Sequence, residues 1–446
     1  MDAFLIPTGR ERDTYENVKP LFEAVHFVVN DPFHFVRLNA DGMLQRMSKA
    51  TLGDMYQNVK LFKEPGAKKA PDFMQKWLTD PTRHTVEKVD FYPPPIVVPA
   101  GCFNTFKGFK ASLLPAVDDV DVDLAPILHH IDVLVGHAPG GAKYVLDWLA
   151  VLLQRPGVDK HMATAILFKG QPGTGKTTFI DWIGREVIGL EHYSYVDNAK
   201  QQLFERFSNA LDKTILCCID EAKQLHQFAD KFKAYITQTT TMVEVKGIQP
   251  VKVNNFARFL MATNNENPIK IEGGDRRFEV FKVSSEHFDD PVYHTYLNNV
   301  WMKDARNVRA FYDMLMARDV ADIQLQTTRP MTDEFRKMQL LNTPAIVEFL
   351  VEAHDSRDDD IETVRGQQFR ARFAHWARSN NRLAALEFSA RYMTQQFEQY
   401  GVVSVNTRID VKKERGYVVE WAKVKEAVVA AYPGLPLFVE ADDVAV

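Results

Sequence analysis

The stretch FKGQPGTGKTTF, residues 168–179, decides the fold of the central part of the chain. Gly170, Gly175, Lys176 and Thr177 satisfy the pattern GxxxxGK[ST], after an apolar run and at the start of a helical pattern. Glycines allow backbone N–H groups to turn toward phosphate oxygens, and the helix N-terminus adds partial positive charge. The stretch therefore predicts a polyphosphate-binding loop between a strand and a helix, rather than a chance glycine-rich turn.

The loop also predicts which groups contact a nucleotide. Lys176 is expected to reach the terminal phosphates, and the Thr177 hydroxyl to ligate Mg²⁺. The expected cofactors are therefore ATP and Mg²⁺. The residues expected to line the phosphates are Gly170, Gly173, Gly175, Lys176, Thr177 and Thr178.

An acidic pair follows a second apolar run, in TILCCIDEA, residues 214–222. Asp220, at the end of a core strand, is placed to hold Mg²⁺ through water. Glu221 is then placed to polarise an attacking water, which favours hydrolysis over small-molecule kinase chemistry. The alternative is that Glu221 is an acid at a helix N-terminus, stabilised by the helix dipole.

Two further polar groups follow later strands. ARFLMATNN, residues 257–265, ends in Asn264, which is expected to touch the terminal phosphate or the water. EGGDRRFEVF carries Arg276 and Arg277 after a Gly-Gly turn. An arginine reaching a neighbouring subunit's phosphate would stabilise transition-state charge, whereas the alternative is an ordinary basic turn.

Between these pieces, TTMVEVKGIQPVKVNNF, residues 240–256, alternates apolar and polar residues on both sides of KGIQP. This pattern predicts a β-hairpin. Lys246 lies at its tip and Lys252 on its return arm. The hairpin is either simply solvated or a moving element of an ATPase.

Strands and helices alternate through this region, which predicts a parallel sheet wrapped by helices. The expected elements are strand 163–168, helix 175–187, strand 214–219, helix 221–237 and strand 257–263.

The flanking regions have different patterns. Four domains are expected: a mixed α+β domain of unknown role at 1–115, a helical collar at 116–160, the α/β core at 161–330, and a C-terminal domain at 331–446.

His129 and His130, in the collar, invite a metal interpretation. Adjacent histidines on a helix point about 100° apart, and no third ligand is spaced to join them. We therefore expect surface or packing histidines.

The C-terminal domain has the pattern helix, helix, hairpin, which is the outline of a winged helix. Ser389 is expected to cap the second helix, and aromatic stripes at helical spacing to form core. Lys412, Lys413 and Arg415 at the hairpin tip are expected to contact DNA phosphates, although such a domain may equally bind protein.

Composition bounds the function further. The chain has 446 residues and a formal net charge of -5, which excludes a uniformly basic surface but not a local basic channel. The three cysteines include no CxxC pair, so a cysteine zinc site is not expected. The start of the sequence lacks a signal-peptide pattern and no apolar run suits a membrane span, so a cytoplasmic location is expected, in the host if a phage encodes the chain.

The order phosphate loop, Asp-Glu strand, lysine hairpin, Thr-Asn strand and arginine resembles the superfamily 3 helicases, most of all the helicase part of phage and plasmid primase-helicases. The resemblance implies an AAA+-type P-loop fold and a ring, usually a hexamer, that moves single-stranded DNA. It implies that Asn264 senses the γ-phosphate, that Arg277, or else Arg276, is the trans-acting arginine, and that Lys246, or else Lys252, grips the strand. A primase or polymerase domain is expected on a separate protein.

The sequence therefore favours an ATP-dependent DNA helicase of a phage or virus-like replicon. The main alternative is an AAA+ ATPase that remodels or loads replication proteins without unwinding DNA. A small-molecule kinase and a non-catalytic origin-binding protein are further alternatives.

Overall fold

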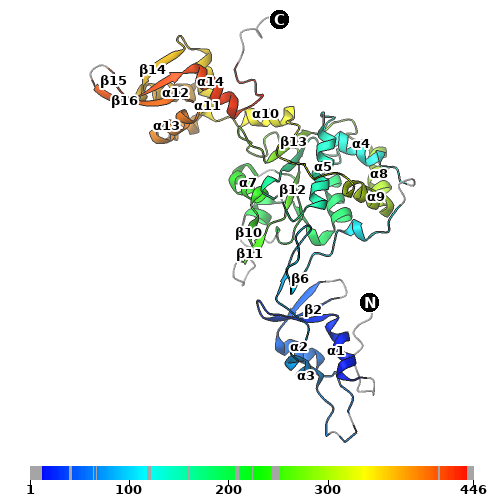
Figure 1. Ribbon diagram of the computed structural model, residues 1–446. Helices are drawn as coiled ribbons and strands as arrows, with labels where there is room; N and C mark the ends of the chain where they lie inside the picture. Colours follow the sequence, from blue (N-terminus) through cyan, green and yellow to red (C-terminus); the bar gives the residue numbers. More distant parts are fainter. Residues whose placement is uncertain are drawn as a thin grey trace. The chain divides into compact units, whose positions relative to one another are not determined.

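Figure 1 shows the computed structural model of the chain. It divides into two compact units, Met1–Gly108 and Phe109–Val446. The structure describes residues 13–39, 43–63, 65–66, 68–117, 122–158, 160–205, 210–222, 225–243, 251–409 and 412–438.

The first unit is a small α/β assembly around a sheet with the strand order β3-β2-β1-β4. β1 pairs with β2 antiparallel, on either side of Asp31-Pro32. A core of aromatic and aliphatic side chains, including Phe22 and Trp77, lies between the sheet and the helices. The elements are α1 (Tyr15–Glu23), β1 (His26–Val29), β2 (His34–Leu38), β3 (Leu44–Met47), α2 (Lys49–Tyr56), α3 (Phe73–Thr79), β4 (Thr85–Val86), β5 (Lys88–Asp90) and β6 (Cys102–Asn104).

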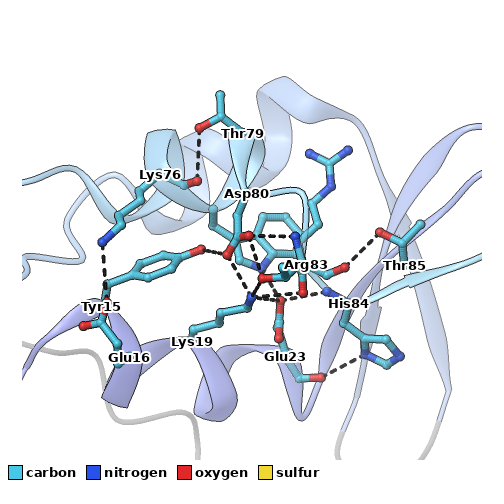
Figure 2. A network of polar contacts seen from close by, with 12 residues as sticks. Tyr15, Glu16, Lys19, Glu23, Lys76, Thr79, Asp80, Arg83, His84 and Thr85 are labelled. Atoms are coloured by element: carbon cyan, nitrogen blue, oxygen red, sulfur yellow. Dashed lines mark hydrogen bonds and ion pairs between the residues drawn. The ribbon is translucent and has the colours of Figure 1, made fainter.

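A polar network joins α1 to the end of α3 (Figure 2). Asp80 accepts hydrogen bonds from the Tyr15 hydroxyl at 2.6 Å and the Lys19 ammonium at 2.8 Å. Lys19 first, and Tyr15 next, hold the pKa of Asp80 well below its usual range. Glu23 accepts from the indole of Trp77 and the backbone N–H of His84, each at 2.8 Å. Every one of these groups is satisfied within the unit, so the network is structural.

The second unit is built on a sheet with the strand order β13-β7-β12-β9-β8. All four strand pairings are parallel, so the carboxyl ends of the five strands lie at one edge, where α/β proteins bind ligands. This confirms the predicted parallel sheet. The strands are β7 (Ala165–Lys169), β8 (Tyr193–Val196), β9 (Leu216–Ile219), β12 (Arg258–Thr263) and β13 (Phe278–Lys282).

Both faces of this sheet are covered by helices, as α5 and α7 show in Figure 1. On one face, Leu167 belongs to a core that includes Phe232 of α7 and Phe335 of α10. On the other face, Phe168 packs against Phe179 of α6. Because successive side chains point to opposite faces, a continuous apolar run such as β7 is what burial on both faces requires.

The helices around the sheet agree with the predicted pattern, with one correction. The expected helix 221–237 begins later, as a 3₁₀ turn at Leu225–Phe228 followed by α7. Among the described residues no helix is both long and apolar enough to cross a membrane. The helices are α4 (Ala125–Leu134), α5 (Gly141–Gln154), α6 (Lys176–Trp182), α7 (Ala229–Thr237), α8 (Pro291–Asn299), α9 (Ala305–Met316) and α10 (Asp333–Leu341), and α6 continues into a π-helical turn at Ile183–Ile188.

The expected hairpin is present as β10 (Thr240–Val243) and β11 (Val251–Asn254), which pair antiparallel. Its tip, residues 244–250, lies outside the described residues. The cysteine pair Cys217 and Cys218 is buried in β9.

The C-terminal part contains the expected order of helix, helix and hairpin, with a third strand added. Ser389 caps α13 through a 3.2 Å bond from the Tyr392 N–H, as expected. The aromatic side chains of α12, among them Phe369 and Phe373, are buried in one core, as expected. The elements are α11 (Ala345–Asp355), β14 (Ile361–Arg365), α12 (Gly366–Ser379), α13 (Ala390–Gln399), β15 (Val403–Ile409), β16 (Lys412–Glu420) and α14 (Trp421–Ala431), and the sheet order is β14-β16-β15.

Candidate functional site: a pocket at the carboxyl edge of the parallel sheet

A pocket of about 470 Å³ opens at the carboxyl edge of the parallel sheet. Its wall combines the loop after β7, the turn after β9 and the end of β12, three segments that are far apart in the sequence. The residues that line it are Pro172, Gly173, Gly175, Lys176, Thr177, Thr178, Asp220, Glu221, Ala262, Thr263, Asn264, His294 and Asn298. Most of the residues expected to bind nucleotide therefore lie together.

The loop after β7 has the backbone that its glycines predict. Gly173 and Gly175 have φ values of 81° and 82°, in the left-handed region that favours glycine. Gly175 is the N-cap of α6, so the free N–H groups of the first helical turn face the pocket side of the loop. Gly170 lies at the other end of the loop and lines a neighbouring pocket of about 740 Å³. The loop is therefore shaped to receive an anion.

Lys176 is nearly buried, at 7% exposure. Its ammonium donates to the carbonyls of Gly170 and Gln171 and, at 3.0 Å, to the hydroxyl of Thr174. Burial lowers the pKa of Lys176 to about 8, while the nearby charge of Asp220 acts in the opposite direction. The amine is thus held inside its own loop, with its charge destabilised until an anion arrives.

Thr177 and Asp220 are in direct contact, because the threonine hydroxyl donates to Asp220 Oδ1 at 2.8 Å. The other carboxylate oxygen, Oδ2, accepts from the Tyr195 hydroxyl at 2.5 Å. Burial first, and the bond to Asp220 next, raise the pKa of Tyr195. Two oxygen ligands of the kind that Mg²⁺ prefers are therefore already side by side, so the donor set fits the expected ion.

Glu221 is exposed and lines the pocket. Its φ of 50° places it in the left-handed region, which is uncommon for a residue with a side chain. Such backbone strain clusters at functional sites. The helix α7 begins only at Ala229, so the alternative of a helix N-terminal acid is wrong for Glu221.

Asn264 follows β12 and is exposed at the pocket wall. The preceding residue, Thr263, anchors this edge because its carbonyl accepts the N–H of Gly170 at 3.0 Å. β12 lies between β7 and β9, which places Asn264 between the phosphate loop and the acidic turn.

Two residues that line the pocket, His294 and Asn298, were missed at the sequence level, as was Tyr195, which contacts the pocket carboxylate Asp220. Tyr195 lies on β8, at the far edge of the sheet, and its contact with Asp220 depends on the strand order. His294 and Asn298 lie on α8, downstream of the motifs. His294 Nε2 donates a hydrogen bond to the carbonyl of His287 at 2.9 Å. No local pattern pointed to any of them, because each reaches the pocket only through tertiary packing.

The two histidines of α4 take different positions, as their 100° separation predicts. His130 is buried against the phosphate loop, where a Cβ added to Gly175 would lie 2.5 Å from its Cε1. Burial lowers the pKa of His130 to about 4, with an opposing contribution from the Gly175 backbone. His129 lies at the surface. The expected packing and surface positions are both confirmed.

The two candidate arginines lie at the amino ends of the parallel strands, opposite the end where the pocket lies. The carbonyl of Arg277 accepts the N–H of Ala165, at the start of β7, whereas the phosphate loop follows its end. From Ala165 to Lys169, β7 advances four residues at ~3.3 Å per residue, so about 13 Å separates the two ends of the sheet. Arg276 is exposed, and the Arg277 side chain is 40% exposed with Asp275 3.7 Å away. Neither contributes to the pocket of its own chain.

The candidate DNA-contacting lysines are only partly described. Lys246 lies outside the described residues. Lys252 is exposed on β11, opposite Met242. Lys412 and Lys413 belong to β16, and Arg415 on the same strand is exposed, with a 2.9 Å bond to Ser404.

Residues 168–277 match a family of unknown function, DUF5906. Part of the chain is similar to a phage protein. Over 164 residues it is 27% identical to a DNA primase-polymerase of Nitratiruptor phage NrS-1, a match that spans 34% of this chain and 22% of that relative. The chain thus covers under a quarter of that protein's length.

Two solved structures share the fold. An apo structure of the NrS-1 C-terminal region has a TM-score of 0.60 at 16% identity, over 88% of this chain and 95% of that one. An A form apo structure of the same region has a TM-score of 0.62 at 15% identity, over 90% and 98%. The chain therefore has the mixed α/β fold, with a parallel sheet, of that region.

Proposed function

We propose that this chain is the ATP-hydrolysing motor of a phage-type replication protein: a DNA helicase of the superfamily 3 class with an AAA+-type core. The observation that carries the proposal is the pair Thr177 and Asp220, bonded at 2.8 Å beside Lys176 and Glu221 in one pocket. Fold similarity alone does not assign a function, but this set of side chains is what phosphoanhydride hydrolysis requires.

Each residue has a role that follows from its position. The loop N–H groups and Lys176 bind the phosphates, and Thr177 and Asp220 hold the Mg²⁺ that arrives with ATP and supplies positive charge to the phosphates. Glu221 accepts a proton from the attacking water. The Tyr195 hydroxyl donates a hydrogen bond to Asp220 Oδ2 and so fixes the orientation of this carboxylate.

The replication context is supported by the similarity to a DNA primase-polymerase. That match spans 22% of the relative's length. A separate primase or polymerase is a proposed partner. Single-stranded DNA is the proposed substrate of movement, and the β10–β11 hairpin, with Lys246 or Lys252, is the proposed gripping element.

A ring of subunits, six by the family resemblance, completes the site in this proposal. Arg277, or Arg276, is separated from the pocket of its own chain by the length of a strand, about 13 Å. An exposed arginine at the opposite edge of the sheet is available to the pocket of a neighbouring copy, where it would stabilise charge in the transition state.

The decisive experiment measures unwinding of a forked DNA duplex by the full chain with ATP. Wild type should unwind, and single-stranded DNA should stimulate its ATPase rate. Lys246→Ala should still hydrolyse ATP but fail to unwind. Lys303→Ala, an exposed lysine outside the proposed machinery, is the matched control and should unwind normally.

Retained unwinding by Lys246→Ala would remove the hairpin from the mechanism. ATPase activity without DNA stimulation or unwinding would favour the remodelling or loading ATPase instead.

A further inference from the structure

A group of side chains outside the nucleotide pocket has the composition of a metal site. Among the described residues, His129, Glu286 and His287 have ligand atoms that all lie within 4.8 Å of one another. His129 comes from α4, and the other two from the segment between β13 and α8. Neither the phosphate loop nor the proposed hydrolysis uses them.

The three ligand atoms form a nearly regular triangle. The two Nε2 atoms of His129 and His287 are 3.0 Å apart, and Oε1 of Glu286 lies 3.7 Å from each of them. The point in the plane of these three atoms that is equidistant from them lies ~2.0 Å from each, the bond length of zinc to imidazole nitrogen or carboxylate oxygen.

We propose that His129 Nε2, His287 Nε2 and Glu286 Oε1 bind one divalent transition-metal ion, Zn²⁺ or an ion of its class. Two imidazoles and one carboxylate, with a fourth position left for water, form a known zinc ligand set. Imidazole favours zinc-class ions, whereas Mg²⁺ favours an all-oxygen set, so this site selects a different ion from the nucleotide pocket.

The surroundings orient the ligands as metal sites require. Asp290 Oδ2 lies 3.1 Å from Nδ1 of His287, so a proton on Nδ1 leaves Nε2 free to bind a metal. The ring of His287 also stacks on Tyr293 at 3.6 Å, which fixes its plane. His287 is therefore held in position before any ion binds.

The third ligand, Glu286, is held by His137. Nε2 of His137 lies 3.2 Å from Glu286 Oε2, and its Nδ1 lies 2.6 Å from Asp132 Oδ2. His137 therefore lies between the two carboxylates and contacts Oε2 of Glu286, so Oε1 remains directed at the two histidines.

The test uses the full chain without a polyhistidine tag, and Zn²⁺ competed against a chromophoric chelator. One Zn²⁺ per chain is expected. Asp290→Asn should weaken binding about 10–100-fold, as loss of an outer-shell partner does, and His129→Ala and His287→Ala should weaken it more. His375→Ala, an exposed histidine on α12, is the matched control and should bind like wild type.

Two further measurements keep the result independent of folding defects. Co²⁺ in the wild-type chain should give the intense visible bands of a tetrahedral site, and Zn²⁺ should raise the Tm of wild type but not of His129→Ala. Excess Mg²⁺ with ATP should leave the Zn²⁺ bound. Displacement by Mg²⁺ with ATP, or equal binding by His129→Ala and wild type, overturns the proposal.

Discussion

The candidate nucleotide pocket and the histidine cluster differ in the donor atoms that they offer. The histidine cluster comprises His129, His137, Glu286 and His287. The pocket offers backbone N–H groups, a hydroxyl and carboxylates at the edge of a sheet. The cluster offers two imidazole nitrogens and one carboxylate oxygen, from a helix and a connecting segment. The difference teaches that one α/β unit can bring together, in adjacent elements, donor sets suited to two classes of cation, because the elements carry different donor atoms.

The two regions meet at the phosphate loop. His294 lines the pocket and contacts the carbonyl of His287, and His130 is buried against Gly175 and lies 3.0 Å through Nδ1 from the Tyr293 hydroxyl. Tyr293 in turn stacks on His287. Substitutions on each side of these contacts therefore test whether the pocket and the histidine cluster act independently.

The largest effect is expected from Glu221→Gln, which removes the proposed base and keeps the shape of the side chain. The kcat of ATP hydrolysis should fall about 10²–10⁴-fold while nucleotide binding persists. Steady-state ATPase assays and nucleotide titrations measure the two quantities. Glu191→Gln, an exposed glutamate elsewhere, is the control. A Glu221→Gln chain with wild-type kcat would show that the pocket has a different base.

A pair of glycine substitutions measures how tightly the histidines pack on the loop. Gly173→Ala and Gly175→Ala both place a side chain at a φ near 80°, which costs about 1–2 kcal/mol. At Gly173 the added Cβ meets nothing within 4 Å, whereas at Gly175 it meets His130. Overpacking should therefore destabilise Gly175→Ala by about 1–3 kcal/mol more than Gly173→Ala in urea unfolding. Equal losses would mean that His130 moves away freely.

The affinity for nucleotide should depend on pH through Lys176. The pKa of Lys176 is about 8 in the free protein, and a bound polyphosphate favours the charged amine, so its pKa is higher in the complex. Affinity should be constant below pH 8 and fall by up to about tenfold per pH unit above it. Calorimetric titrations between pH 7 and 9.5 measure this slope. Lys176→Arg stays charged and should lose the slope; the same slope in that variant would assign it to another group.

The smallest effect is expected from Tyr195→Phe, which removes the 2.5 Å bond to Asp220. Because Tyr195 is 39% exposed, solvent compensates in part, and a loss of about 1 kcal/mol is expected. The Mg²⁺ concentration for half-maximal ATPase activity should rise about fivefold. Tyr193→Phe, which loses a bond to Asp181 instead, is the control and should leave it unchanged.

Much of the lining of the pocket could be predicted from the sequence, because many of the residues that line it follow strand ends closely. Lys176 and Thr177 follow β7, Asp220 and Glu221 follow β9, and Asn264 follows β12. In a parallel sheet all such ends lie at one edge, so recognising the strands was sufficient. The start of α7 was misplaced because the left-handed turn at Glu221 interrupts a pattern that is otherwise helical.

The sequence by itself determined the phosphate loop, the acidic strand, the arms of the hairpin and the parallel sheet, since spacing and periodicity over a few residues specify them. Only the tertiary structure decided that Tyr195 contacts Asp220 and that the arginines lie at the amino ends of the parallel strands. It also decided that His129 contacts His287, 158 residues away in the sequence. The physical reason is that strand order and helix packing depend on contacts between distant segments, which local spacing does not encode.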